Sequence, residues 1–342
     1  MTTPGPTVVF DHLQRMTDQR GTFEHALLSE PRPEHGYCTD DMARVLVVAA
    51  RQPDSGGDVN RLARIAIQFL NDAQSFSFGG KCRNRMDRNR KWTDEPAAED
   101  AWGRCLWGLG TAAAHSEVSL IRRLAVIQFD RSARVRSPWP KAMAFAALGA
   151  AELLSVDPGH AAARALLTDY AAGVVGPYGD PAWPWPEARL TYANAVFPEA
   201  MIAAGVALED HTLQQRGLDL LAWLVEHETL DGHLSPTPAG GSGPTDARPG
   251  FDQQPIEVST IADACARAAD ADASAVWPDS VRLAASWFDG ANDAGLPMWD
   301  PQTGGGFDGL HSDGVNRNQG AESTLAVIAT MQHAQRFCPV PQ

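Results

Sequence analysis

The stretch "MAFAALGAAELL", residues 143–154, is apolar around almost its whole circumference when it is drawn as a helix. A helix that is apolar on every side is typically buried on every side. Two further stretches have the same character, "AVFPEAMIAAGVAL" at 195–208 and "ESTLAVIATM" at 322–331. We therefore expect several helices that lie wholly inside the molecule.

Amphipathic helices alternate with these buried helices along the chain. "NRLARIAIQFLNDA" at 60–73 and "TLQQRGLDLLAWLVEH" at 212–227 place apolar residues at helical spacing and leave a charged face. The expected helices span residues 7–19, 40–51, 59–75, 98–115, 117–130, 138–155, 160–175, 190–206, 209–228, 254–270, 274–290 and 319–337. Six buried helices alternating with six half-exposed helices predict an all-α (α/α)6 barrel, a closed ring of helical hairpins whose inner helices run parallel.

The sequence shows no division into separate units. No linker or low-complexity segment interrupts the helical pattern, so we expect one domain over residues 1–342. The segment "SFSFGGKCRNRMDRNRKW" at 75–92 alternates loosely with turn residues and is compatible with a small β-hairpin over one end of the barrel.

Charge and cysteine usage exclude several classes of function. The formal net charge of −14 argues against a surface for nucleic acid or anionic lipid. No apolar run reaches the roughly 18 residues that a membrane-spanning helix needs, and "MTTPGPTVVFDH" does not resemble a secretory signal. The five cysteines, Cys38, Cys82, Cys105, Cys265 and Cys338, form no CxxC pair. We therefore expect a cytoplasmic protein with reduced thiols and no structural zinc.

Polar and aromatic residues gather just before the buried helices or in their first turns. These clusters are "HGYCTDD" (35–41), "WTDEPAAEDAWGR" (92–104), "RVRSPWPK" (134–141), "PAWPWPEARLTYAN" (181–194), "GFDQQPIE" (250–257) and "GGGFDGLHSDGVNRNQGAE" (304–322). Because parallel inner helices open their N-termini at one face, the clusters must converge on one mouth. This convergence is the strongest functional signal in the sequence.

The composition of the mouth favours a carbohydrate. Tyr37, Trp183, Trp185 and Tyr192 offer faces on which sugar rings stack, and Trp92, Trp139 and Phe307 are further aromatic residues of the mouth. Side chains expected to bind hydroxyl groups are His35, Asp40, Asp100, Arg104, Asn194, Asp252, Gln253, Gln254, Asp308, Asn318 and Glu322. No GxxxxGK[ST] motif and no HxH or HxxxH pair occurs, and we interpret the glycines of "TGGGFDG" (303–309) only as a turn, so we expect neither a nucleotide cofactor nor a metal.

Carboxylates are the second feature of the mouth. Inner helices three steps apart face each other across a six-membered ring, so Asp41 is expected opposite Glu187, and Asp100 opposite Glu257. Glycoside cleavage needs two carboxyl groups on opposite sides of the scissile bond. Structural explanations compete with this one, because acids in a first turn favour the helix dipole and an Asp100–Arg104 pair stabilises a helix by itself.

The motifs "HGYCTDDMAR" (35–44), "FDQQPIE" (251–257) and "GFDGLHSDGVNRNQGAEST" (306–324) resemble bacterial proteins that accompany glycosyltransferases and are described as glycosidase-like. The whole chain resembles the (α/α)6 six-hairpin glycosidase superfamily. That resemblance implies paired acids at positions such as Asp41, Glu187, Glu257 or Glu322, and a functional link to a glycosyltransferase.

Together these patterns predict a glycoside hydrolase that acts on an oligosaccharide or polysaccharide by inversion. Asp41 is the expected base, and Glu257 or Glu187 the expected acid. Alternatives on the same barrel are a sugar phosphorylase, for which Arg134 and Arg136 are the candidate phosphate ligands, or an epimerase that uses His35 or His311. A further alternative is a glycan-binding partner of a glycosyltransferase that catalyses nothing.

Overall fold

The computed structural model describes residues 7–177 and 182–337, and these residues contain the twelve α-helices that the sequence predicts. The inner helices are α2 (Thr39–Arg51), α4 (Asp100–His115), α6 (Pro140–Val156), α8 (Val196–Leu208), α10 (Pro255–Ala271) and α12 (Ala321–Phe337). The outer helices are α1 (Asp11–Arg15), α3 (Gly57–Ala73), α5 (Ser119–Ser132), α7 (Ala161–Gly173), α9 (His211–His227) and α11 (Val276–Phe288).

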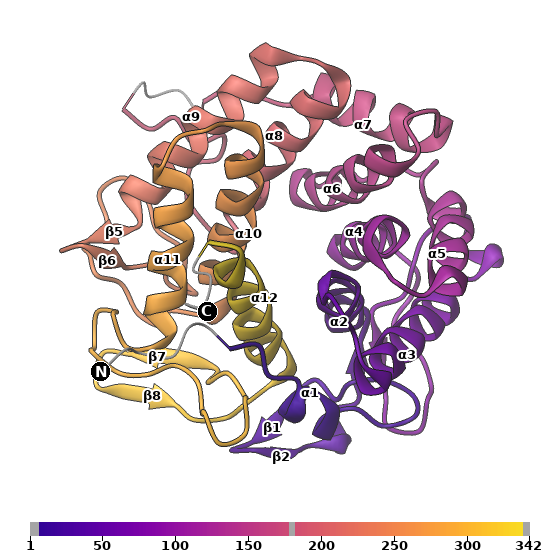
Figure 1. The fold of residues 1–342 in the computed structure, drawn as a ribbon, viewed down its shortest axis with the longest axis horizontal. Coiled ribbons are helices and arrows are strands. Elements are labelled where there is room, and N and C mark those ends of the chain that lie inside the picture. The colour runs from indigo at the N-terminus through magenta and orange to yellow at the C-terminus, as the bar shows by residue number, and fades with distance from the viewer. Residues whose placement is uncertain (1–6, 178–181, 338–342) are drawn as a thin grey trace.

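The inner helices form a closed ring (Figure 1). Each packs against the next in the order α2, α4, α6, α8, α10 and α12, and α12 packs back against α2. The outer helices lie against this ring, for example α3 against α2 and α5 against α4. The structure therefore confirms the (α/α)6 barrel.

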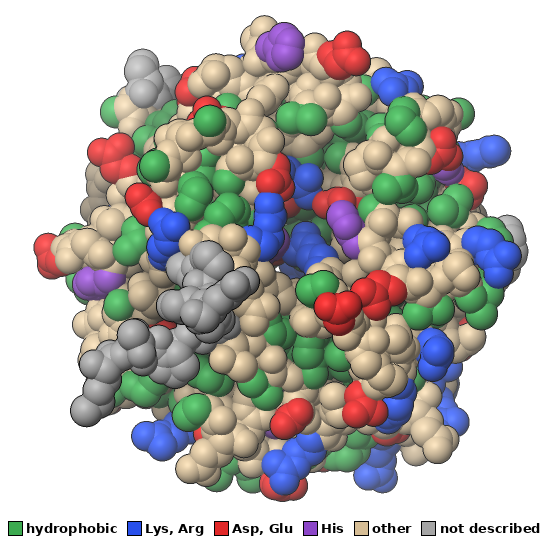
Figure 2. Space-filling view, viewed as in Figure 1, with side chains coloured by type: hydrophobic (Ala, Val, Ile, Leu, Met, Phe, Trp, Pro, Cys, Tyr) green, Lys and Arg blue, Asp and Glu red, His purple; other side chains and the backbone are tan. Residues whose placement is uncertain are grey.

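The inner helices run parallel, as expected. Asp41 and Arg104, near the starts of α2 and α4, line one cavity, whereas Arg51 and His115, at the ends of the same helices, line another. Figure 2 shows the second of these ends, where Lys or Arg, Asp or Glu and His side chains surround a central hollow. The N-terminal end is the mouth on which the polar clusters converge.

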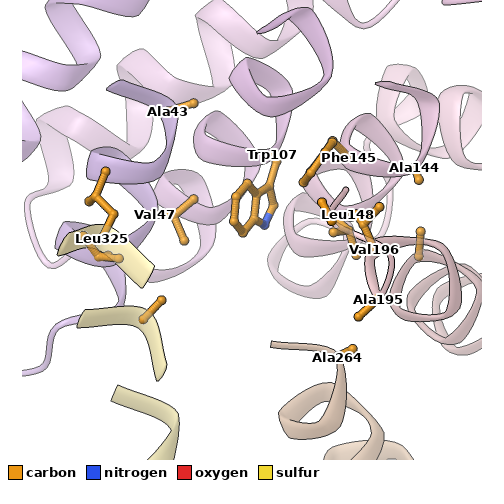
Figure 3. Packing of buried hydrophobic residues seen from close by; sticks show 14 of the residues in the cluster. Ala43, Val47, Trp107, Ala144, Phe145, Leu148, Ala195, Val196, Ala264 and Leu325 are labelled. Carbon is orange, nitrogen blue, oxygen red and sulfur yellow. The ribbon is translucent and has the colours of Figure 1, made fainter. Parts of the chain in front are cut away.

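Small residues let the inner helices approach closely. A Cβ atom on Gly110 of α4 would lie 2.0 Å from the carbonyl oxygen of Gly149 in α6, so only glycine fits there. Larger side chains fill the space inside the ring, where Trp107 of α4 and Phe145 of α6 lie with ring centroids 5.7 Å apart. Figure 3 shows this contact beside residues from the other inner helices.

Four two-stranded antiparallel sheets decorate the barrel. They pair β1 (Ala26–Leu27) with β2 (Glu30–Pro31), β3 (Tyr37–Cys38) with β4 (Arg85–Met86), β5 (Thr229–Leu230) with β6 (His233–Leu234), and β7 (Gly309–His311) with β8 (Gly314–Asn316). The end of the segment 75–92 turns back on itself as a short hairpin, in which Met86 forms an antiparallel bridge with Trp92, and its strand β4 also pairs with β3 just before α2. Short 3-10 helices cover Pro33–His35 and Phe76–Phe78.

Two helix boundaries differ from the sequence prediction. The helix expected over 7–19 shortens to α1. The helix expected over 190–206 begins only at Val196, because Ala193 adopts a left-handed φ of 46° and the side chain of Asn194 accepts a hydrogen bond from the Thr191 amide. The residues before α8 are thus a loop at the mouth.

Within the described ranges, four cysteines are buried and free, namely Cys38, Cys82, Cys105 and Cys265, while Cys338 lies outside those ranges. None of the helices in residues 7–177 and 182–337 combines the length and the apolar character that a bilayer crossing requires.

Candidate active site

A polar cavity of about 470 Å3 opens at the N-terminal end of the inner ring, and we call it the central cavity. Charged and titratable side chains dominate its lining: Glu24, His25, Asp40, Asp41, Arg44, Arg85, Arg104, Asp252, Asp308, His311 and Glu322. They come from α2, β4, α4, the β7–β8 hairpin and α12, and from the loops before α2, α10 and β7. Five of the six polar clusters contribute to this lining, and only the cluster at 134–141 does not.

Asp41 lines the central cavity with only 2% of its surface exposed. The Cys38 thiol donates to its Oδ2 (3.0 Å), and Arg44 Nη1 donates to its Oδ1 (2.8 Å). The other end of the same guanidinium, Nη2, lies 2.8 Å from Glu322 Oε2. Burial raises the pKa of Asp41 to about 6, although the positive charge of Arg44 opposes this shift.

Asp40 precedes Asp41 in the same helical turn but has different partners. Arg104 Nη1 donates to its Oδ1 (3.0 Å), and Asn84 Nδ2 donates to its Oδ2 (2.8 Å). Burial would raise the pKa of Asp40, but the charges of Arg104 and Arg44 outweigh it and hold that pKa below its usual value. Two consecutive aspartates thus have pKa values that are shifted in opposite directions, a pattern typical of a paired acid and base.

A histidine and carboxylate pair lies at the edge of the same cavity. His311 Nδ1 on β7 is 2.5 Å from Asp252 Oδ1, which precedes α10. Asp308 is also part of this side of the cavity and accepts a hydrogen bond from the Gly320 amide (2.8 Å). Burial raises the pKa of Asp308 above its usual value.

Neither of the two carboxylates predicted to be the acid lines the central cavity. Glu257 is 3% exposed, and its two oxygens accept hydrogen bonds from the Ala193 amide (2.6 Å), the Asn194 amide (3.2 Å) and Asn194 Nδ2 (3.2 Å). It therefore braces the loop before α8. Glu187 lines a neighbouring cavity rather than that of Asp41, so Asp41 and Glu187 do not face each other across one cavity.

Three of the four predicted stacking rings are buried. Tyr37, Trp183 and Trp185 are 2%, 3% and 0% exposed, because they pack into the hydrophobic core. They are therefore closed to a sugar in the mouth. Tyr192 is the exception, with 44% of its surface exposed and a place in the wall of the central cavity.

The predicted polar contacts divide in the same way. The central cavity includes Asp40, Arg104, Tyr192, Asp252, Gln254, Asp308 and Glu322. Gln253 is fully buried and donates to Asp293, Asn318 accepts from the Leu28 amide, and Asn194 belongs to the Glu257 brace. His35 is exposed but does not line the cavity. Asp100 contacts both Arg104 and Tyr192 and lines the neighbouring cavity.

The predicted set omits several residues of the central cavity. These are Glu24, His25, Cys38, Arg44 and Arg85, whereas His311 enters the sequence prediction as a candidate for epimerase chemistry. For Arg44 the sequence carries a signal, since it is the only charged residue in the otherwise apolar stretch 42–50 and stands three residues after Asp41. Arg136, a candidate phosphate ligand, instead donates to Asp169 (2.7 Å) away from this cavity.

Metal ligands are not clustered in this site. The described part of the chain holds no group of three or more His, Cys, Asp or Glu side chains arranged to bind a metal ion. The carboxyl groups and imidazoles that line the cavity can transfer protons, and its guanidinium groups can stabilise negative charge.

Comparison with known proteins identifies similar folds. No protein-family model matches the sequence, and no curated protein sequence matches it. Similar solved structures include a sugar epimerase from a ruminal bacterium (TM-score 0.70, 13% identity, 96% of this chain and 95% of that chain). A second is a D-mannose isomerase (TM-score 0.66, 12% identity, 96% of this chain and 94% of that chain). A third is an inactive variant of the α-1,6-mannanase of Salegentibacter sp. HEL1_6 (TM-score 0.59, 11% identity, 95% of this chain and 97% of that chain). At these identities the likeness concerns the fold, and the chain is an (α/α)6 barrel like those enzymes.

Proposed function

We propose that this chain is an enzyme that cleaves a glycosidic bond, with Asp41 as the proton donor and Asp40 as its ionised partner. The observation that carries the proposal is the opposite pKa shift of two consecutive aspartates that line one polar cavity. A buried carboxyl with a pKa of about 6 is half protonated near pH 6, so it can donate a proton to a leaving oxygen. The sequence alone assigned Asp41 the role of base, and its burial favours that of acid.

Asp40 has the properties of the second carboxylate. Its bonds to Arg104 and Asn84 keep it ionised and fix its orientation. An ionised carboxylate either activates water or attacks the anomeric carbon, depending on its distance from the acid. Inversion, which the sequence predicts, stays a prediction that the anomer of the first product tests.

The comparisons support a sugar substrate for this chain. The three similar structures are named for action on sugars, and the inactive mannanase variant has two consecutive aspartates replaced by alanine. Asp40 and Asp41 are consecutive aspartates in this chain, and both line the central cavity. The acidic net charge suits a neutral or cationic glycan.

The test is a product assay on purified protein with α- and β-linked gluco-, manno-, galacto- and arabino-oligosaccharides, with and without phosphate. Sugar release that is lost in both Asp40→Asn and Asp41→Asn supports the proposal. Release that requires phosphate indicates a phosphorylase. Glycan binding without any turnover indicates a binding partner, such as one for a glycosyltransferase, and overturns the catalytic roles.

A second candidate is a sugar epimerase or isomerase, and the His311–Asp252 pair favours it. A histidine oriented by a carboxylate can remove a proton from carbon next to a carbonyl group. Incubating reducing sugars in D2O distinguishes the two reactions. Deuterium at C2 of the product identifies an epimerase and deuterium at C1 an isomerase, in each case lost in His311→Asn, whereas hydrolysis labels neither carbon.

A further inference from the structure

A second cavity of about 700 Å3 adjoins the central cavity, and we call it the outer cavity. Tyr192 lines both. Its hydroxyl donates to Asp100 Oδ2 (2.6 Å), and Arg104 Nη1 lies 3.4 Å from the same oxygen. A bonded group of three side chains therefore forms the boundary between the two cavities, and a chain-like ligand can extend from one to the other across Tyr192.

Trp139 lies in the lining of the outer cavity with 57% of its surface exposed. This exposure is unusual in this molecule, because the six tryptophans Trp102, Trp107, Trp183, Trp185, Trp277 and Trp287 are all buried. Trp139 is the N-cap of α6, and Pro140 follows it at the first helical position, so the backbone that carries the indole is restrained. An exposed aromatic face that is held in place at a cavity is a ready surface for stacking.

Tyr192 gives the same cavity a second exposed ring. Lys141 Nζ lies 4.0 Å from the centroid of this ring and also donates to the Thr191 hydroxyl and to the Tyr192 carbonyl oxygen. Together with the bond to Asp100, these contacts fix the ring before any ligand binds. Pre-ordered aromatic faces lower the entropy cost of binding.

The polar lining of the outer cavity consists mainly of acceptors. Asp94, Glu95, Glu99, Asp100 and Glu187 supply carboxylates that accept hydrogen bonds from hydroxyl groups. The single cation of the lining is Lys141, which is buried and already engaged. This balance of charge repels uronates and sulfated sugars and suits neutral glycans.

We propose that the outer cavity is a second sugar subsite, which binds the next unit of a neutral glycan whose reacting unit occupies the central cavity. Trp139 is the stacking platform of this subsite, and Tyr192 separates it from the reacting unit. The inference rests on the proposed function for the identity of the central cavity, but it concerns binding and not bond cleavage.

The experiment measures binding of neutral manno- and gluco-oligosaccharides of one to five units by calorimetry. The full chain carrying Asp41→Asn is used so that no substrate is consumed. We expect the affinity to be about tenfold higher for the oligosaccharide that is one unit longer than the one that fills the central cavity. Adding Trp139→Ala should abolish this increment, and Trp139→Phe should restore most of it. Leu120→Ala, which removes an exposed apolar side chain on α5 remote from both cavities, is the control.

Each outcome separates the subsite from the proposed function. If Trp139→Ala leaves the increment unchanged, or weakens every chain length equally, the subsite is overturned even where Asp41→Asn abolishes hydrolysis. If the increment is lost while the wild-type chain hydrolyses nothing, the subsite stands and the hydrolase proposal fails. Binding of uronate oligomers that matches or exceeds binding of neutral ones overturns the assigned ligand class.

Discussion

The pKa of Asp41 depends on the positive charge of Arg44 and on the negative charge of Glu322, which contacts the same guanidinium group. Burial raises this pKa, Arg44 lowers it, and Glu322 raises it again. If Asp41 is the proton donor, activity should fall as pH rises through about 6, because only the protonated form donates. Glu322→Gln removes the negative charge, so the pH at which activity is halved should move downward. The pH dependence of kcat/KM tests this.

Arg44→Gln is the opposing variant for the same titration. It removes the positive charge, so the pKa of Asp41 should rise and the falling limb of the profile should move to higher pH. Shifts of both variants in the same direction, or a profile that neither variant moves, would assign the limb to a group other than Asp41. Circular dichroism at each pH shows whether the variants stay folded.

Glu228 provides a residue-scale test of stability. It is 1% exposed, and burial raises its pKa from the usual 4.5 to about 7. The folded state therefore binds this proton more tightly than the unfolded state, so stability falls as pH rises from about 4.5 to about 7. The free energy of unfolding of Glu228→Gln, measured relative to that of the wild type in urea, should increase by about 2 kcal/mol when the pH is raised from 5 to 8. The exposed Glu226→Gln should show no such gain.

Single residues were harder to predict from sequence than the mouth itself. Trp183, Trp185 and Glu257 have the residue types of a sugar site and the right place in the chain, yet all three are turned into the core. Sequence position fixes which end of the barrel a loop reaches. It does not fix which side of the loop faces the cavity, because that depends on contacts such as the bonds from Glu257 to Ala193 and Asn194.

At the scale of elements, the contact between α4 and α6 depends on glycine. A Cβ atom on Gly149 would lie 2.1 Å from the Leu106 carbonyl oxygen. Gly149→Ala should therefore destabilise the protein by about 1–3 kcal/mol or more, since the two backbones must separate. Gly173→Ala, at the end of α7 where a Cβ would meet no atom within 4 Å, should instead be neutral or stabilising by up to about 1 kcal/mol. Equal thermal midpoints for the two variants would contradict the close packing.

Helices can be predicted from the sequence where the periodic pattern is long. The prediction fails where individual hydrogen bonds decide the local conformation. The inner helices were predictable because each carries small apolar residues around its whole circumference, as in 143–154, and a helix of this kind is stable only when it is buried. The start of α8 was not, because the left-handed Ala193 and the Asn194 side chain hold the preceding segment as a loop. The strand β4 pairs with a strand much earlier in the chain, since Met86 is in register with Tyr37, 49 positions before it, and no local pattern specifies that pairing.

On the scale of the whole molecule, parallel inner helices give the barrel two chemically distinct ends. The N-terminal end holds the proposed acids, and the C-terminal end holds a cavity of about 750 Å3 where ion pairs connect neighbouring helices. There Arg51 of α2 contacts Asp263 of α10 at 2.5 Å. The number and alternation of helices predict this polarity, whereas the partners of each charge depend on side-chain geometry.

Arg267 of α10 tests how this second end supports the ring. Its guanidinium binds Glu152 of α6 (2.7 Å) and Glu199 of α8 (3.0 Å). Arg267→Met would leave two largely buried carboxylates without their cation, so we expect a loss of about 3 kcal/mol at pH 8 in urea unfolding.

The loss of stability caused by Arg267→Met should be smaller at pH 5.5. Burial already raises the pKa of Glu199 to about 7, and removal of the cation raises this pKa further. Glu199 is therefore neutral at pH 5.5 and does not need a cation there. Adding Glu199→Gln should restore part of the stability at pH 8 for the same reason. Arg282→Met, which breaks an exposed pair with Asp279 on α11, should change stability by less than about 0.5 kcal/mol. A loss from Arg267→Met that is equal at both pH values would show that lost packing, and not the unpaired charge, weakens the ring.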